Sequence, residues 1–278
     1  MPSIHLIRVK APPRPQTNAF LEEIASDSII SRSFLKRPSA RVPRGAIWHI
    51  GNARELPDAA IYFALGREAV VKAQSFDDGT REFMEAALEQ APFTHGVYDR
   101  LTQTAGILVR PGVSMSAREV SKKVQVLLDS TGIAAQHNAF FDVDPILDPV
   151  GLIEALRSAR RITRFEFSFS LRNPPDDEKF IQRPLKDYGG RIGATDGKAS
   201  LKGESLEKEP LVDLTRAVAA EGDEVVVNLQ GNDGRGIVRR SLKSNYLRED
   251  IEEKEGETAP LILQAIRRGY ARMRGLSE

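Results

Sequence analysis

The sequence predicts an α+β fold, built as a mixed, largely antiparallel sheet with packed helices. Segments whose apolar residues alternate are interleaved with segments whose apolar residues recur every three or four positions. Short runs of turn residues separate several of the alternating segments, which favours antiparallel hairpins. With 278 residues, 41% of them hydrophobic and 28% charged, the chain can bury a substantial core.

In the first half of the chain, strands and helices are predicted in turn. Alternation predicts strands over residues 4–9, 46–50, 59–65 and 105–109. Helical spacing predicts helices over residues 18–30, over 81–90, and from Ser114 or Ser116 to about residue 130. Serine is a favoured N-cap residue, so the start of the last of these helices is well defined.

The second half continues the same interleaving. Phe165, Phe167 and Phe169 alternate with polar residues and predict a strand over 162–171. Helices are expected over 150–159, 211–220 and 260–276, and strands over 224–229 and 236–242. Residues 231–234 supply the turn of the last hairpin, and the acidic residues 248–257 are expected to be exposed.

Two regions are expected, an N-terminal α+β region over 1–140 and a C-terminal α+β region over 141–278. Residues 176–210 are polar and rich in glycine, which indicates a flexible insertion with one helix near 177–188. A single domain remains an open alternative.

The composition removes several function classes. The chain has no cysteine, which excludes disulfides, thiolate catalysis, zinc ribbons and iron–sulfur clusters. Its longest apolar runs are shorter than the roughly 18 residues that a membrane helix needs. With no signal peptide in view, a cytoplasmic protein without membrane contact is expected.

One acidic group could support catalysis. Asp142 and Asp144 follow a predicted strand end, and with Glu166 they could hold Mg²⁺ for phosphodiester cleavage. In the competing interpretation these acids belong to turns. The four histidines are scattered and show no metal-ligand spacing, so no cofactor other than this Mg²⁺ is predicted.

Positive charge is concentrated in two clusters, although the net charge is only +1. The candidate phosphate-binding residues are Arg235, Arg239, Arg240 and Lys243 near the last hairpin, and Arg267, Arg268, Arg272 and Arg274 on the last helix. Guanidinium groups match phosphate geometry, and such contacts bind nucleic acid without reading its sequence. In the alternative interpretation, the helix arginines pair with the acids of residues 249–257.

The order of several short segments resembles that of uncharacterised bacterial proteins of similar length associated with phage-defence loci. The resemblance spans about residues 60–245 and is carried by Ala91-Pro92-Phe93-Thr94, Phe141-Asp142-Val143-Asp144-Pro145 and Asn173-Pro174. It implies nucleic-acid binding or the sensing of infection, and it implies no catalytic residue.

The leading hypothesis is a non-enzymatic protein that binds nucleic acid, DNA or RNA, or senses infection in prokaryotic antiviral defence. The first alternative is a metal-dependent nuclease or phosphoryl-transfer enzyme that uses the acidic group. The second alternative is a scaffold that acts with a partner protein, and a homo-oligomer is left open.

Overall fold

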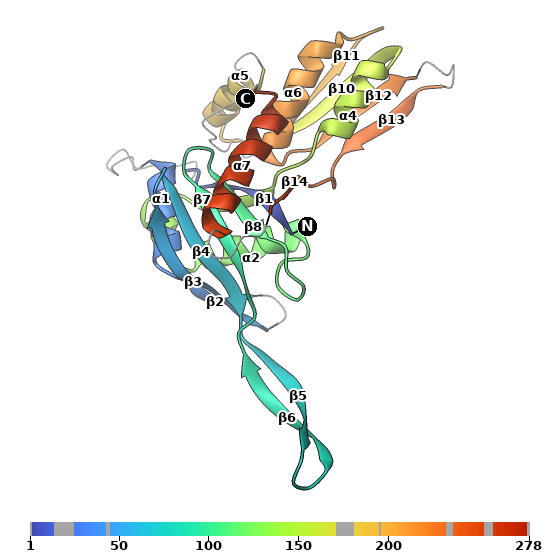
Figure 1. Ribbon diagram of the computed structural model, residues 1–278. Helices are drawn as coiled ribbons and strands as arrows, with labels where there is room; N and C mark the ends of the chain where they lie inside the picture. The colour runs from blue at the N-terminus through green and yellow to red at the C-terminus, as the bar shows by residue number, and fades with distance from the viewer. Residues whose placement is uncertain are drawn as a thin grey trace.

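The computed structural model describes residues 2–13, 25–42, 45–170, 181–194, 196–231, 236–252 and 258–276. The fold is α+β, as predicted: two antiparallel sheets carry helices, and a separate two-stranded hairpin projects from the first sheet (Figure 1). The first sheet is assembled from both ends of the chain, so residues beyond 140 complete it.

The first sheet has the strand order β14-β1-β8-β7-β4-β3-β2, and β9 also pairs with β1. Its strands are β1 (Ser3–Lys10), β2 (Ser39–Arg41), β3 (Ile47–Leu56), β4 (Ala60–Arg67), β7 (Phe93–Asp99), β8 (Thr104–Leu108), β9 (Asp142–Pro145) and β14 (Arg248–Asp250). Most side chains of β1 are buried on both faces, because helices cover both sides of the sheet there.

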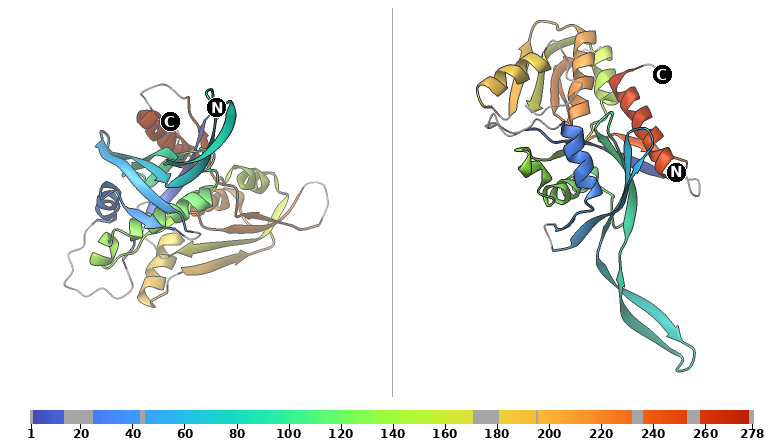
Figure 2. Two further views of the ribbon diagram at one scale, coloured as in Figure 1. Left: turned by 90° about the horizontal axis from the view of Figure 1, so that it is seen from below. Right: turned by 90° about the vertical axis from the view of Figure 1, so that its left-hand side faces the viewer.

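Helices sandwich this sheet. One face carries α1 (Ser26–Leu35), α2 (Ala117–Asp129) and α3 (Ile133–Gln136), and the other carries α7 (Thr258–Arg274) (Figure 2). The predicted start of α2 is confirmed, because the Ser116 side chain accepts a hydrogen bond from the Glu119 backbone N–H at 3.4 Å. On α7, Ile262 and Ile266 are fully buried against the sheet.

The second sheet has the order β11-β10-β12-β13. Its strands are β10 (Arg161–Ser170), β11 (Asp196–Lys202), β12 (Val225–Gln230) and β13 (Val238–Leu242), and its helices are α4 (Val150–Ser158), α5 (Gln182–Arg191) and α6 (Lys208–Glu221). The predicted alternation along β10 is confirmed, since Phe165, Phe167 and Phe169 are all buried beneath these helices. In the part of the chain that the structure describes, the helices of this unit all pack on that one face.

The hairpin formed by β5 (Ala69–Asp77) and β6 (Glu82–Gln90) corrects one prediction. Residues 81–90 were expected to form a helix, but they pair residue by residue with β5 from Asp77–Glu82 to Ala69–Gln90. The helical spacing of apolar residues in this segment was misleading, because a nine-residue cross-strand ladder satisfies the same backbone groups.

Three further expectations are corrected. The insertion predicted as flexible contains a strand, β11, which pairs with β10 along its whole length, and the helix expected near 177–188 is α5, at Gln182–Arg191. The acidic stretch after residue 247 begins with β14, which pairs with β1, and its Glu249 is only 5% exposed. The strand predicted over 46–50 is longer than expected, because β3 runs on to Leu56 and its turn to β4 lies at residues 57–59.

Several predictions lie partly outside the described residues. The helix expected over 18–30 is α1 from Ser26 onward, and residues 14–24 lie outside the described ranges. The pairing of the last hairpin is confirmed by the β12–β13 register, from Val225–Leu242 to Leu229–Val238. Of the turn predicted over 231–234, residues 232–234 lie outside the described ranges, as does the candidate Arg235.

Candidate nucleic-acid interface

The arginines of α7 mainly attach this helix to the first sheet. Arg267 pairs with Asp99 at 3.1 Å and donates to the Asp58 carbonyl at 2.7 Å. Asp99 has no exposed surface, so its charge depends on partners inside the fold.

The next two arginines of α7 share one acid. Arg268 pairs with Glu249 at 3.2 Å and Arg272 also contacts its carboxylate. These pairs fit the alternative interpretation of the sequence, in which the helix arginines meet acids of residues 249–257. Arg274, in the last turn, is half-buried.

The cations of β13 are arranged differently. Arg239 and Arg240 are both exposed and point to opposite faces of the second sheet, because successive residues of a strand alternate. Lys243, just beyond the strand, pairs with Glu224 at 3.2 Å. Leu242 is buried on the helix-covered face, which places Arg240 on that side and Arg239 on the other.

Arg239 belongs to a row of polar residues that crosses all four strands of the second sheet. In the observed register Lys202 on β11 lies opposite Arg164 on β10, Arg164 opposite Asn228 on β12, and Asn228 opposite Arg239. We call these residues, Lys202, Arg164, Asn228 and Arg239, the cationic row. Three inter-strand spacings give it a length of about 14 Å.

The cationic row lies on the face that the helices leave open. The buried phenylalanines of β10 occupy odd-numbered positions, so even-numbered Arg164, Glu166 and Ser168 point to the opposite face. Neither α4, α5 nor α6 packs on this face within the described ranges. We call it the open face of the second sheet.

Two acids on the open face are matched by cations, and the register places a third, Asp196, opposite Ser170 at the end of β11. Glu166 pairs with Arg164, and Glu224 pairs with Lys243. Lys198, Lys202 and Arg239 are exposed and have no acidic partner among the residues that the structure describes. The open face therefore carries uncompensated positive charge, which favours contact with an anion.

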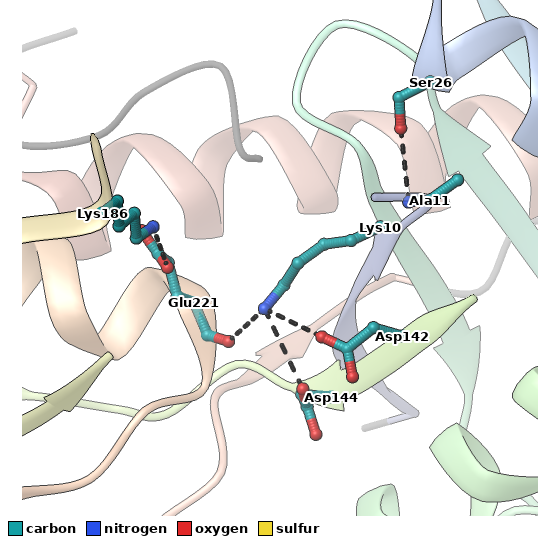
Figure 3. A network of polar contacts seen from close by, with 7 residues as sticks. All are labelled: Lys10, Ala11, Ser26, Asp142, Asp144, Lys186 and Glu221. Atoms are coloured by element: carbon teal, nitrogen blue, oxygen red, sulfur yellow. Dashed lines mark hydrogen bonds and ion pairs between the residues drawn. The ribbon is translucent and has the colours of Figure 1, made fainter. Parts of the chain in front are cut away.

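The acidic candidates Asp142 and Asp144 lie at the junction between the two sheets (Figure 3). Both contact the Lys10 ammonium, Asp142 at 3.3 Å and Asp144 at 3.9 Å. Lys10 is 1% exposed and also donates to the Glu221 carbonyl at 3.0 Å. The Lys10 ammonium thus already occupies the position between the two carboxylates where a metal ion would bind.

The third member of the predicted acidic group is elsewhere. Glu166 lies on the open face and pairs with Arg164, whereas Asp142 and Asp144 lie on β9. Within the described ranges, no three His, Asp or Glu side chains are grouped so that they could hold a metal ion. The structure therefore does not bring the three predicted acids together.

A buried ion pair that was not predicted adjoins this junction. Glu221, at the end of α6, pairs with Lys186 of α5 at 2.8 Å, and both side chains are almost fully buried. Burial raises the pKa of the Glu221 carboxyl to about 7, while Lys186 and Lys10 act in the opposite direction. The sequence held one signal of a buried charged group here: Lys10 directly follows a predicted strand in which Ile4, Leu6 and Val9 are apolar.

The histidines have separate structural surroundings. His5 is buried and its Nε2 lies 3.0 Å from the Ser114 carbonyl oxygen, and burial lowers its pKa. His49 contacts Glu68 at 3.1 Å, and His95 is hydrogen-bonded to the Tyr62 hydroxyl at 2.7 Å. Each of these three is held by local partners.

Comparisons add no family to these observations. No family model matches the chain, and no curated protein matches it. In the described part of the chain, every helix is too short or too polar to cross a membrane.

Proposed function

We propose that the protein binds nucleic acid through its phosphates, and that the open face of the second sheet is the contact surface. The observation that carries the proposal is the cationic row, which aligns Lys202, Arg164, Asn228 and Arg239 across four strands. Long flexible lysines and forked guanidinium groups on a flat sheet suit a polyanion, because each can reach a separate phosphate.

The chemistry of the open face supports affinity without base recognition. Its central row contributes cations and one amide, Asn228. The neighbouring positions on β10 and β11 are Glu166, which is paired with Arg164, and Ser200, and Ser168 and Lys198 follow. Contacts to phosphates position a nucleic acid and carry no sequence information. Binding should therefore weaken steeply with salt and vary little with sequence.

A role in prokaryotic antiviral defence, with infection sensing, belongs to the same proposal and is supported only by the sequence resemblance. A cytoplasmic location would follow from a nucleic-acid partner. The nuclease alternative lacks comparable support, because the Lys10 ammonium already contacts Asp142 and Asp144, and Glu166 pairs with Arg164.

The proposal is tested by fluorescence anisotropy with labelled single- and double-stranded DNA and RNA at about 50 and 200 mM salt. The test variant is Lys202→Glu with Arg239→Glu. It should lose at least about tenfold in affinity for every sequence, because both substitutions repel phosphate.

The matched control is Arg240→Glu, which changes the adjacent residue of β13 on the other face of the sheet. It should retain most of the parent affinity. Equal affinity of the double variant and the parent, or no binding by the parent at the lower salt, would refute the proposal.

A further inference from the structure

The hairpin of residues 69–90, which we call the arm, stands apart from the rest of the molecule. Its strands β5 and β6 pair with each other and with no other strand of the described chain. Figures 1 and 2 show it projecting from the end of the first sheet. The arm therefore lacks the neighbouring strands or helices that usually stabilise a sheet. An isolated two-stranded hairpin of this kind is only marginally stable in water.

Apolar side chains on the arm face solvent. Phe83 is 85% exposed and Phe76 is 48% exposed, and their ring centroids lie 5.0 Å apart. Val70, near the base of the arm, is 70% exposed. Exposed apolar groups clustered on one projecting element are typical of an interaction site.

The charge of the arm excludes a polyanion as its partner. Residues 69–90 contain five acidic and two basic residues, a net charge of −3. Such a segment repels phosphate and attracts a basic surface. Its partner should therefore offer positive charge, apolar groups and, for a strand, an unpaired sheet edge.

The same chain presents a surface with these three properties. β13 pairs only with β12 in the described residues, so its outer edge has unpaired backbone groups. Ile237 is 55% exposed and Val238 is 40% exposed. Residues 237–243 include three basic residues and no acidic one. Lys243 pairs with Glu224, so Arg239 and Arg240 carry the positive charge that complements the acidic arm.

We propose that the arm of one copy adds as a strand to the β13 edge of a second copy. Backbone hydrogen bonds would extend the second sheet, Phe83 and Phe76 would pack near Ile237 and Val238, and the opposite charges would fix the partner. Two different surfaces meet in this contact, so it is heterologous and can repeat from copy to copy.

The inference is tested by sedimentation velocity of the full chain at about 50 μM, without nucleic acid. One variant, Phe83→Asp, impairs the arm, and another, Val238→Asp, impairs the edge. Both positions are exposed, so each variant should keep the melting temperature of the parent. Phe83→Ser replaces Phe83→Asp should the latter melt at a lower temperature.

The parent should self-associate, and each variant alone should sediment as a monomer. An equimolar mixture of the two variants should form a 1:1 dimer, because one contributes an intact edge and the other an intact arm. Raising the salt to about 1 M should weaken the association of the parent, because charge attraction is screened.

A monomeric parent, or variants that associate as strongly as the parent, would overturn the inference and leave another partner for the arm. A mixture that stays monomeric would also overturn it. Since the assay contains no nucleic acid, its failure is distinguishable from a failure of the proposed function.

Discussion

The arginines of α7 and the cations of the second sheet have the same chemistry and different surroundings. Arg267, Arg268 and Arg272 each meet an acid that the first sheet buries, either Asp99 or Glu249. Lys202 and Arg239 meet no acid in the described residues and lie exposed on a sheet face. Density of positive charge along a sequence therefore does not separate the two groups, whereas the presence or absence of a nearby acid does.

The largest difference should appear in stability. Arg267→Ala leaves Asp99 fully buried without its cation, and we expect a loss of about 3 kcal/mol in the free energy of unfolding. Arg239→Ala removes an exposed side chain and should change that free energy by less than about 0.5 kcal/mol. Chemical denaturation of both variants measures the contrast, and equal losses would remove the distinction between the two groups.

A buried charged group, centred on the Glu221 carboxyl, should make the stability of the fold depend on pH. Glu221 faces Lys186 from α5, Lys10 from β1 and Asp223 from its own segment, and its pKa is raised to about 7 by burial. A raised pKa means that the folded state holds a proton which the unfolded state releases near pH 4.5. The stability from Glu221 is therefore lost as pH rises from 4.5 to 7, by roughly 3 kcal/mol at most.

Glu221→Gln should abolish this contribution, so the difference in stability between parent and variant should change across that pH range. Thermal melts at pH 4.5, 6 and 8 would measure it. The difference is the informative quantity, because the lowered pKa of His5 gives the parent an opposite trend. A constant difference across pH would show that Glu221 does not titrate there.

A smaller effect on stability should come from the close approach of Glu249 to Gly269 on α7. A Cβ at Gly269 would lie 2.6 Å from the Glu249 Cγ, so the absence of a side chain lets this acid approach Arg268 and Arg272. Gly269→Ala should destabilise the fold by about 1 kcal/mol, although alanine normally stabilises a helix. Gly190→Ala on α5, where a Cβ meets nothing within 4 Å, is the control and should be neutral or stabilising. Stabilisation by both substitutions would contradict the role given to Glu249.

Local signals predicted the elements better than the sites. The cap of α2 at Ser116 and the two faces of β10 were readable, because both depend on residues close in sequence. The hairpin at residues 69–90 was missed, because a short apolar segment carries no decisive period.

The candidate site depends on contacts between distant segments. The cationic row joins residues 164, 202, 228 and 239, and only the register of three strand pairs aligns them. Asp99 and Arg267 are 168 positions apart, so their pairing had no local signal. Sequence reasoning therefore included Arg239 among its candidates but could not separate it from the arginines of α7 that pair with buried acids.

The most direct test of this separation is the salt dependence of binding to a labelled single-stranded oligonucleotide. The parent is compared with Lys202→Ala/Arg239→Ala and with Arg191→Ala/Arg240→Ala, which removes two exposed cations away from the open face. The account predicts that the slope of log K against log salt becomes shallower by about 1.4 for the first pair and stays unchanged for the second. Equal slopes for the parent and both pairs would contradict the assignment of phosphate binding to the open face.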